Sequence, residues 1–215
     1  MTTLRLASYQ EQRLRWPTNG RHIMAQYDEQ TIVVYQAYRP AIGHFAARNN
    51  YFGGDFSYSR MSWIKPNFLW MMYRSGWGTK PNQEVTLAIH LKRTYFDVLL
   101  REAVASSYSG TQFATREEWQ RAVANSDVRS QWDPDHNPSG GREERRAVQL
   151  GLRGQMLQGF KGEAIISIED ISGLVAEQQV NARNEKYADL VTPFESVYPV
   201  TNSSVRNRLG MNIYP

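Results

Sequence analysis

The sequence from Arg60 to Gly78 reads Arg-Met-Ser-Trp-Ile-Lys-Pro-Asn-Phe-Leu-Trp-Met-Met-Tyr-Arg-Ser-Gly-Trp-Gly. It contains three of the chain's six tryptophans, with three cations among them. Aromatic rings interleaved with fixed cations can stack a flat ligand while holding its phosphates. Apolar residues also recur at helical spacing between Pro66 and Gly76, which equally indicates a buried helix. The three cations are Arg60, Lys65 and Arg74.

The composition indicates one globular domain. The chain has 215 residues, 41% of them hydrophobic, which is enough for one sizeable core. The longest apolar run, from Phe68 to Tyr73, is far too short to span a bilayer, and the residues after Met1 form no signal-peptide core. We therefore expect a cytoplasmic protein without a membrane partner. The absence of cysteine excludes disulfides, thiolate metal sites and cysteine nucleophiles.

The charge of the chain favours anionic partners. The formal net charge is +4, and 20 of the 25 basic residues are arginine. The planar guanidinium group suits phosphates and nucleic-acid backbones, so we expect a phosphate-bearing ligand or nucleic acid. A genome rich in G and C would raise the arginine content in the same way, so the excess alone does not decide the function.

Strand and helix patterns interleave along the chain. β-branched, aromatic or alternating segments predict strands, and apolar residues at helical spacing predict helices between them. Because the order lacks the regular alternation of a doubly wound sheet, we predict an α+β fold, a single domain with a mixed or antiparallel sheet and flanking helices. The predicted strands are 31–38, 84–91 and 164–168, and the predicted helices, besides that of the opening sequence, are 41–46, 94–105, one from 115 and 170–175.

The two ends of the chain differ in composition from its middle. Residues 1–30 are polar and mixed, and they predict an irregular N-terminal lead-in. Residues 31–181 form the predicted α+β core domain. Residues 182–215 are polar and punctuated by proline, and we expect them to pack on the core as a C-terminal arm.

Two segments allow alternative interpretations. Residues 142–158 form either a helix with a basic face or a strand with alternating apolar residues. Residues 133–141 predict a loop, in which two carboxylates and an imidazole could bind a cation or transfer protons. An Asx turn closed by the flanking prolines explains the same residues. The cluster consists of Asp133, Asp135 and His136.

Several common catalytic motifs are missing. The sequence has no Gly-x-x-x-x-Gly-Lys, Gly-x-Gly-x-x-Gly, His-Glu-x-x-His or Gly-x-Ser-x-Gly. Standard nucleotide-triphosphate hydrolysis, Rossmann-type binding, zinc proteolysis and hydrolase-elbow chemistry therefore lack their usual parts. An enzyme of this sequence would need another layout.

The sequence resembles a family of small proteins known only as a domain of unknown function, numbered 4291. The run from Trp63 to Trp77 has the residues of that family's signature. It is preceded by Val-Tyr-Gln-Ala-Tyr38 and followed by Gln-Trp-Asp-Pro134 and by Arg-Ala-Val-Gln-Leu-Gly-Leu-Arg-Gly154. The likeness covers about residues 21–177, and it implies no particular activity.

The segment from Ile32 to Gly54 also resembles the opening of the ADP-ribosyltransferase fold. In that fold a strand with a central histidine or arginine is followed by a helix and a glycine. Here the strand carries Gln36, which departs from the usual pattern, and the helix ends at Phe52-Gly53-Gly54. The resemblance implies NAD as the cofactor and Gln36 as a catalytic residue.

The chemistry of ADP-ribosyl transfer suggests catalytic and binding roles for further residues. Cleavage of the nicotinamide–ribose bond develops an oxocarbenium-like charge, which a nearby carboxylate stabilises. The nicotinamide needs an aromatic wall, and the pyrophosphate needs cations. The candidate carboxylates are Glu163 and Glu169, the candidate aromatic residues are Tyr35, Tyr38 and Trp63, and the candidate cations are Arg39, Lys65 and Arg74.

Three hypotheses for the function follow. The first is an NAD-using, ADP-ribosyltransferase-like transferase that acts on nucleic acid or protein. The second is a non-catalytic binder of RNA or single-stranded DNA, in which tryptophans stack bases and arginines follow phosphates. The third is a structural or partner-binding module whose aromatic run is all core. The binder would use Trp63, Trp70 and Trp77 together with Arg142, Arg146 and Arg153.

Overall fold

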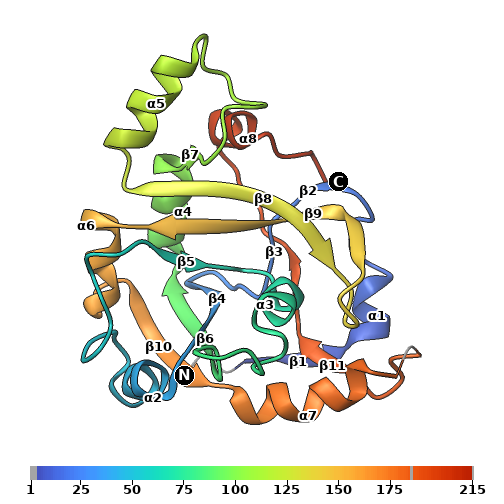
Figure 1. Ribbon diagram of the computed structural model, residues 1–215. Helices are drawn as coiled ribbons and strands as arrows, with labels where there is room; N and C mark the ends of the chain where they lie inside the picture. Colours follow the sequence, from blue (N-terminus) through green and yellow to red (C-terminus); the bar gives the residue numbers. More distant parts are fainter. Residues whose placement is uncertain (1–3, 185, 215) are drawn as a thin grey trace.

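The computed structural model describes residues 4–184 and 186–214 and has an α+β fold (Figure 1). Its centre is an antiparallel three-stranded sheet with the order β10-β6-β4. Side chains alternate between its two faces, as the sequence pattern predicted. The strands are β4 (Thr31–Tyr38), β6 (Val85–Lys92) and β10 (Ile165–Asp170).

A second sheet is built on the long hairpin of β8 and β9. Its strand order is β2-β9-β8-β7, and β5 pairs with β9 off this path. Both parallel and antiparallel pairs occur in it. Its strands are β2 (Gly20–Arg21), β5 (Ser62–Ile64), β7 (Val104–Ala105), β8 (Val128–His136) and β9 (Arg142–Leu152).

The hairpin of β8 and β9 decides between the helix and strand interpretations of residues 142–158, and it corrects the predicted loop at residues 133–141. Residues 142–152 are a strand, and a short helix follows from Gly154. The predicted loop at residues 133–141 was wrong in its first part, because β8 continues to His136. Pro134 is accommodated there by a register shift between Pro134 and His136. Such a bulge tolerates a residue that cannot donate to the ladder.

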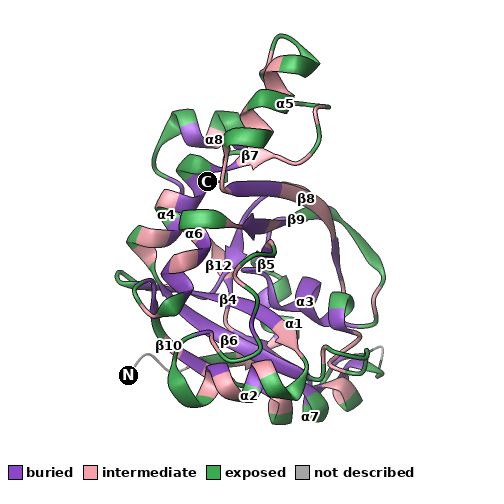
Figure 2. Ribbon diagram, turned by 60° about the vertical axis from the view of Figure 1, so that its left-hand side comes forward, coloured by how far each residue is buried: buried purple, intermediate pink, exposed green. Residues whose placement is uncertain are grey.

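The helices cover both faces of the central sheet. Helices α3 and α7 pack on the face that carries Val33 and Tyr35, while α2, α4 and the second sheet enclose the face that carries Ile32 and Val34. Figure 2 shows the resulting buried strands and, apart from them, the exposed α5. The helices are α1 (Tyr9–Arg13), α2 (Pro40–Asn49), α3 (Phe68–Ser75), α4 (Arg93–Glu102), α5 (Arg116–Asn125), α6 (Gly154–Gln158), the 3-10 helix η1 (Gly159–Lys161), α7 (Ser172–Ala182) and α8 (Ser203–Leu209).

Segments near the two ends of the chain pair with each other. Strand β1 (Leu6–Ser8) pairs with β11 (Val191–Pro193), and β3 (Met24–Ala25) pairs with β12 (Ser196–Val197). The C-terminal residues therefore lie against the N-terminal ones beside α3. Among the helices that the structure describes, none has the length and hydropathy needed to cross a membrane.

The opening sequence forms β5 and α3, and it joins the two sheets. Backbone hydrogen bonds connect Tyr35 of β4 with Lys65, directly after β5, in both directions, with N–O distances of 2.6 and 3.2 Å. Helix α3 then begins at Asn67, whose side chain accepts a hydrogen bond from Trp70 N, and it ends at Gly76 in the left-handed conformation. Beyond the Tyr35–Lys65 bridge the two strands diverge.

Candidate functional site

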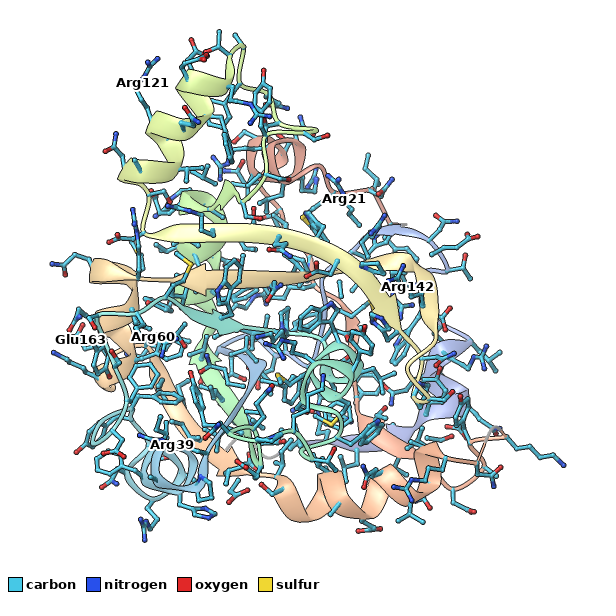
Figure 3. All side chains as sticks on the ribbon, in the orientation of Figure 1. Arg21, Arg39, Arg60, Arg121, Arg142 and Glu163 are labelled. Atoms are coloured by element: carbon cyan, nitrogen blue, oxygen red, sulfur yellow. The ribbon has the colours of Figure 1, made fainter. Side chains whose placement is uncertain are left out.

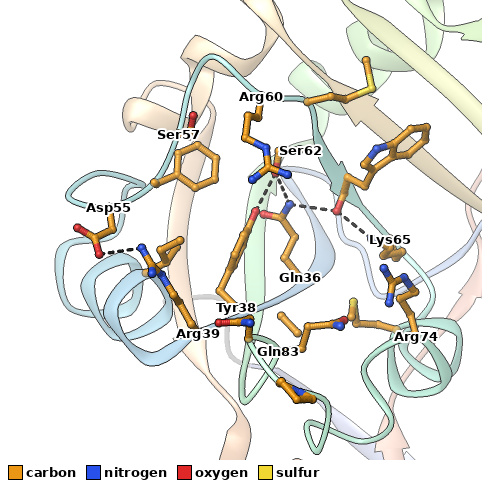
Figure 4. A pocket seen from close by; sticks show the side chains of 18 residues that line it. Gln36, Tyr38, Arg39, Asp55, Ser57, Arg60, Ser62, Lys65, Arg74 and Gln83 are labelled. Atoms are coloured by element: carbon orange, nitrogen blue, oxygen red, sulfur yellow. Dashed lines mark hydrogen bonds and ion pairs between the residues drawn. The ribbon is translucent and has the colours of Figure 1, made fainter.

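A pocket of about 650 Å³ opens where β4 and β5 diverge (Figure 4). Its lining comes from three segments: the end of β4 with the start of α2, the loop before β5 with β5 itself, and α3 with the turn that follows. The volume is within the range of about 300–1,000 Å³ that is usual for small-molecule and cofactor sites.

Six of the residues proposed from sequence line this pocket, together with Arg60. The alternation of β4 directs Gln36 and Tyr38 to one face of the sheet. Arg39 follows β4 directly and is the N-cap residue of α2. Residues from β5 and α3 complete the wall. The six residues are Gln36, Tyr38, Arg39, Trp63, Lys65 and Arg74.

The floor of the pocket is a hydrogen-bonded group of polar side chains. Gln36 Nε2 donates to Ser62 Oγ at 2.7 Å and to the carbonyl oxygen of Trp63 at 3.0 Å. The hydroxyl groups of Tyr38 and Ser62 are 2.8 Å apart. Gln36 is only 2% exposed, and no described residue donates a hydrogen bond to its buried Oε1. That oxygen is a buried acceptor without a hydrogen-bond partner among the described residues.

Lys65 is an unusual member of the lining because it is only 7% exposed. Its Nζ donates to the carbonyl oxygen of Trp63 at 3.0 Å and lies 5.5 Å from the ring centroid of Trp70. Burial, and after it the nearby charge of Arg74, lower the pKa of Lys65 to about 7, and the charge of Asp133 opposes the shift. The amine thus changes its charge near neutral pH.

The charge of the lining is strongly unbalanced. Three arginines and Lys65 line the pocket, and of the described residues that line it only Asp55 is a carboxylate. Asp55 Oδ2 accepts a hydrogen bond from Arg39 at 2.9 Å, and both side chains are about half exposed. In Figure 4 the guanidinium groups of Arg39, Arg60 and Arg74 lie around Gln36. Such an arrangement attracts anions.

Three residues proposed for the site lie elsewhere. Tyr35 is fully buried on the opposite face of β4, where its ring packs edge-on against Phe68 at a centroid distance of 5.4 Å. Glu169 pairs with His90 on that same opposite face, with 2.6 Å between Oε1 and Nε2. Glu163 is exposed at the edge of the molecule (Figure 3). The expected carboxylates therefore do not line the pocket.

The proposed platform of three tryptophans is also not formed. Trp70 is 5% exposed and belongs to the interior, and Trp77 is held by a hydrogen bond from Nε1 to the carbonyl oxygen of Pro138. The arginines proposed with them share no helical face, because Arg142 and Arg146 are exposed on strand β9. Arg153 follows that strand and lies 3.7 Å from Asp127.

A second polar cluster, which the sequence did not reveal, lies sealed at the N-terminus of α3. Arg145 Nη2 and Asp135 Oδ2 are 2.6 Å apart, and both side chains are less than 10% exposed. Glu195 Oε1 accepts a hydrogen bond from Phe68 N at 2.7 Å. Asn67 Nδ2 lies 3.5 Å from a carboxylate oxygen of each acid. We call Asn67, Asp135, Arg145 and Glu195 the sealed cluster.

The titration of Glu195 follows from its position in the sealed cluster. Burial raises the pKa of Glu195 to about 8, and the charge of Asp135 raises it as well. The hydrogen bond from Phe68 and the charge of Arg145 act in the opposite direction. Sequence reasoning missed this residue because Glu195 lies outside every motif, and the pairing of β12 with β3 brings it to α3.

The predicted cluster of Asp133, Asp135 and His136 is not one site. Asp133 accepts hydrogen bonds from Gln131 and Gln149, both at 2.8 Å, whereas Asp135 belongs to the sealed cluster. The His136 ring stacks on Tyr73 with a centroid distance of 3.5 Å. Burial lowers the pKa of His136, which favours the neutral imidazole.

Comparison with known protein families matches residues 22–198 to the family described as Domain of unknown function (DUF4291). The chain belongs to this family. The match includes the whole of β4, β5 and α3, and with them all the residues that line the pocket. Comparison with curated proteins finds no match. The description of the family names no activity, so the function has to be argued from the pocket.

Proposed function

We propose that the pocket binds NAD and that the protein transfers ADP-ribose from it to nucleic acid or protein. The observation that carries the proposal is the excess of cations over carboxylates around a buried polar floor. A pyrophosphate satisfies those cations, and guanidinium groups bind phosphate oxygens in pairs. Arg39, Arg60 and Arg74 are exposed at the pocket and have the length to reach a ligand there.

The free edge of β4 supports a carboxamide ligand. The N–H groups of Val33 and Tyr35 point away from β6, toward Gln26 O and Lys65 O. In an antiparallel ladder this direction repeats every second residue, so the N–H and C=O of Ala37 face the same edge. Ala37 lines the pocket where β5 has turned away. The backbone N–H and C=O of Ala37 can pair with the C=O and NH2 of the nicotinamide carboxamide, as a strand edge pairs with the backbone of an added strand.

The other proposed contacts are made to the nicotinamide ring and to a ribose of NAD. Trp63, half-buried in the lining, provides a flat apolar surface for the nicotinamide ring. The free Oε1 of Gln36 accepts a hydrogen bond from a ribose hydroxyl group. Ser62 fixes the orientation of the Gln36 amide, because Ser62 Oγ accepts a hydrogen bond from Nε2, which leaves Oε1 without a partner among the described residues.

The proposed reaction needs stabilisation of positive charge at the ribose. The bond between C1′ and the nicotinamide nitrogen breaks, its electron pair stays on the ring, and nicotinamide leaves as a neutral molecule. A nucleophile of the acceptor bonds to C1′ and loses its proton. Gln36 Oε1 places the negative end of a buried dipole at the site, in the role that Glu163 and Glu169 were expected to fill.

Incubation of the pure protein with isotopically labelled NAD and total RNA, DNA or cell lysate tests the proposal. We expect label in one acceptor class, release of nicotinamide, and binding of NAD by calorimetry. The matched control for Arg74→Ala is Arg121→Ala, because Arg121 lies on the exposed α5, far from Arg39 and Arg60 in Figure 3. Absence of binding, transfer and nicotinamide release together would end the proposal.

A further inference from the structure

Lys65 has a chemical environment that anion binding alone does not require. Three arginines already line the pocket as permanent cations. Lys65 adds a primary amine that is almost fully buried, and its partner is a carbonyl oxygen, that of Trp63. The apolar ring of Trp70 lies 5.5 Å from the nitrogen. An ammonium group in this position is poorly solvated, so the neutral amine is favoured.

Neutral lysine is a nucleophile, whereas the ammonium ion is not. Desolvation and a neighbouring cation are the two conditions that activate a lysine toward carbonyl compounds. Lys65 meets both, because burial and the charge of Arg74 lower its pKa to about 7. An unperturbed lysine has a pKa near ~10.4 and is almost entirely protonated at neutral pH.

We propose that Lys65 forms an imine with the carbonyl group of a phosphorylated aldehyde or ketone whose phosphate is held by Arg74. The Nζ lone pair attacks the carbonyl carbon, and the nitrogen loses a proton as the carbonyl oxygen gains one. The resulting carbinolamine loses its hydroxyl group together with the remaining N–H proton as water, which leaves the C=N bond. No electrons are exchanged with an outside reagent. The inference goes beyond the proposed NAD chemistry and does not require it.

Arg74 couples the amine to the phosphate. Arg74 and Lys65 line the same pocket, and the charge of Arg74 lowers the pKa of Lys65. A ligand that carries both a phosphate and a carbonyl group can therefore engage the guanidinium group of Arg74 while its carbonyl carbon meets the Nζ of Lys65. A carbonyl compound without the phosphate lacks the first contact and should react less.

Pyridoxal 5′-phosphate is a suitable probe, because it combines an aldehyde, a planar ring and a phosphate. The full-length protein is treated with it at pH 7, the imine is reduced with borohydride, and the labelled peptides are identified by mass spectrometry. We expect Lys65 to be labelled at least ~10-fold more than the exposed Lys80, since far more of its amine is unprotonated. Labelling spread over the exposed lysines with Lys65 unlabelled would overturn the inference.

Matched reagents and variants test the ligand class. Pyridoxal lacks the phosphate, and we expect it to label Lys65 at least ~10-fold less; equal labelling by both would refute a phosphorylated ligand. Arg74→Ala should lower labelling of Lys65, and Arg121→Ala should not. Lys65→Arg keeps a cation without a nucleophilic amine, so labelling in the pocket should be lost while the thermal transition shows that the protein is folded.

Calorimetry with NAD on the same samples separates this inference from the proposed function. NAD binding without labelling of Lys65 contradicts the imine and leaves the transferase proposal standing. Labelling of Lys65 without NAD binding supports the imine and contradicts the transferase proposal. Protection of Lys65 from the probe by bound NAD would show that both ligands occupy the one pocket.

Discussion

Residues 60–78 contribute to both the pocket and the sealed cluster, yet the two regions differ in their balance of positive and negative side chains. Among the described residues that line the pocket are three exposed arginines, the buried Lys65 and one carboxylate. The sealed cluster has two carboxylates and one arginine, all less than 10% exposed. The first arrangement leaves positive charge for an anion to neutralise, whereas the second satisfies its charges within the protein.

This difference separates ligand binding from structure. In the sealed cluster Asn67 and Glu195 accept hydrogen bonds from the first N–H groups of α3, and Arg145 neutralises Asp135 on the neighbouring strand. In the pocket α3 presents Arg74 to solvent, and Lys65 lies just before the helix. The sealed cluster therefore fixes the helix that supplies the pocket, and substitutions in the two regions should affect different properties.

The largest expected effect is on the sealed cluster. Arg145→Met leaves Asp135 buried without its cation, which should lower the free energy of unfolding by about 3–5 kcal/mol. Arg74→Met removes an exposed cation and should change it by less than about 1 kcal/mol. Urea unfolding of the two variants measures the contrast. Equal losses of stability would show that the two regions do not differ as described.

The next effect is the pH dependence that Glu195 contributes. The folded pKa, about 8, lies above the unfolded value, so the folded protein holds the extra proton between these values. The stability contributed by the neutral acid is present at low pH and is lost as pH rises through about 8. Glu195→Gln cannot lose this proton. Between pH 5 and 8 we expect the wild type to lose about 3–4 kcal/mol relative to Glu195→Gln.

The contribution of Lys65 to the free energy of unfolding should change with pH in the opposite direction to that of Glu195, and by a smaller amount between pH 7 and 9. Its folded pKa, about 7, lies below the unfolded value, so the unfolded chain holds more protons between them. The stability of the wild type should therefore rise with pH relative to Lys65→Met, by about 2 kcal/mol between pH 7 and 9. Chemical unfolding at a series of pH values measures it, with the exposed Lys80→Met as the control. A flat difference for Lys65→Met would contradict a buried, easily deprotonated amine.

Much of the fold was predictable because its signals are local. Alternation and β-branched residues predicted Thr31–Tyr38 with its observed bounds, and a helix was predicted from residue 115, where Thr115 Oγ1 accepts a hydrogen bond from Glu118 N and caps α5. The strand at 133–136 was missed, because Pro134 and the polar residues around it are typical of a loop. Pairing with β9 along a bulged ladder determines that segment, and no local pattern reports such pairing.

For the site, too, residues placed by local sequence were predictable, and residues placed by long-range pairing were not. Gln36, Tyr38 and Arg39 were predictable because they are consecutive or alternate along one strand and its end, and Trp63, Lys65 and Arg74 share one motif. Glu169 was misplaced because its face depends on the register of β10 against β6, which the sequence does not specify. Glu195 could not be found, since only the pairing of the chain's two ends brings it to α3.

The central claim is that the cations around the pocket bind a phosphorylated planar ligand. Calorimetric titration of NAD into the wild type, Arg74→Ala and Arg121→Ala at one ionic strength tests it most directly. We predict saturable binding to the wild type, an affinity at least ~10-fold weaker for Arg74→Ala, corresponding to about 1.4 kcal/mol, and an unchanged affinity for Arg121→Ala. Absence of NAD binding to the folded wild type, or equal affinities for all three proteins, would contradict the account.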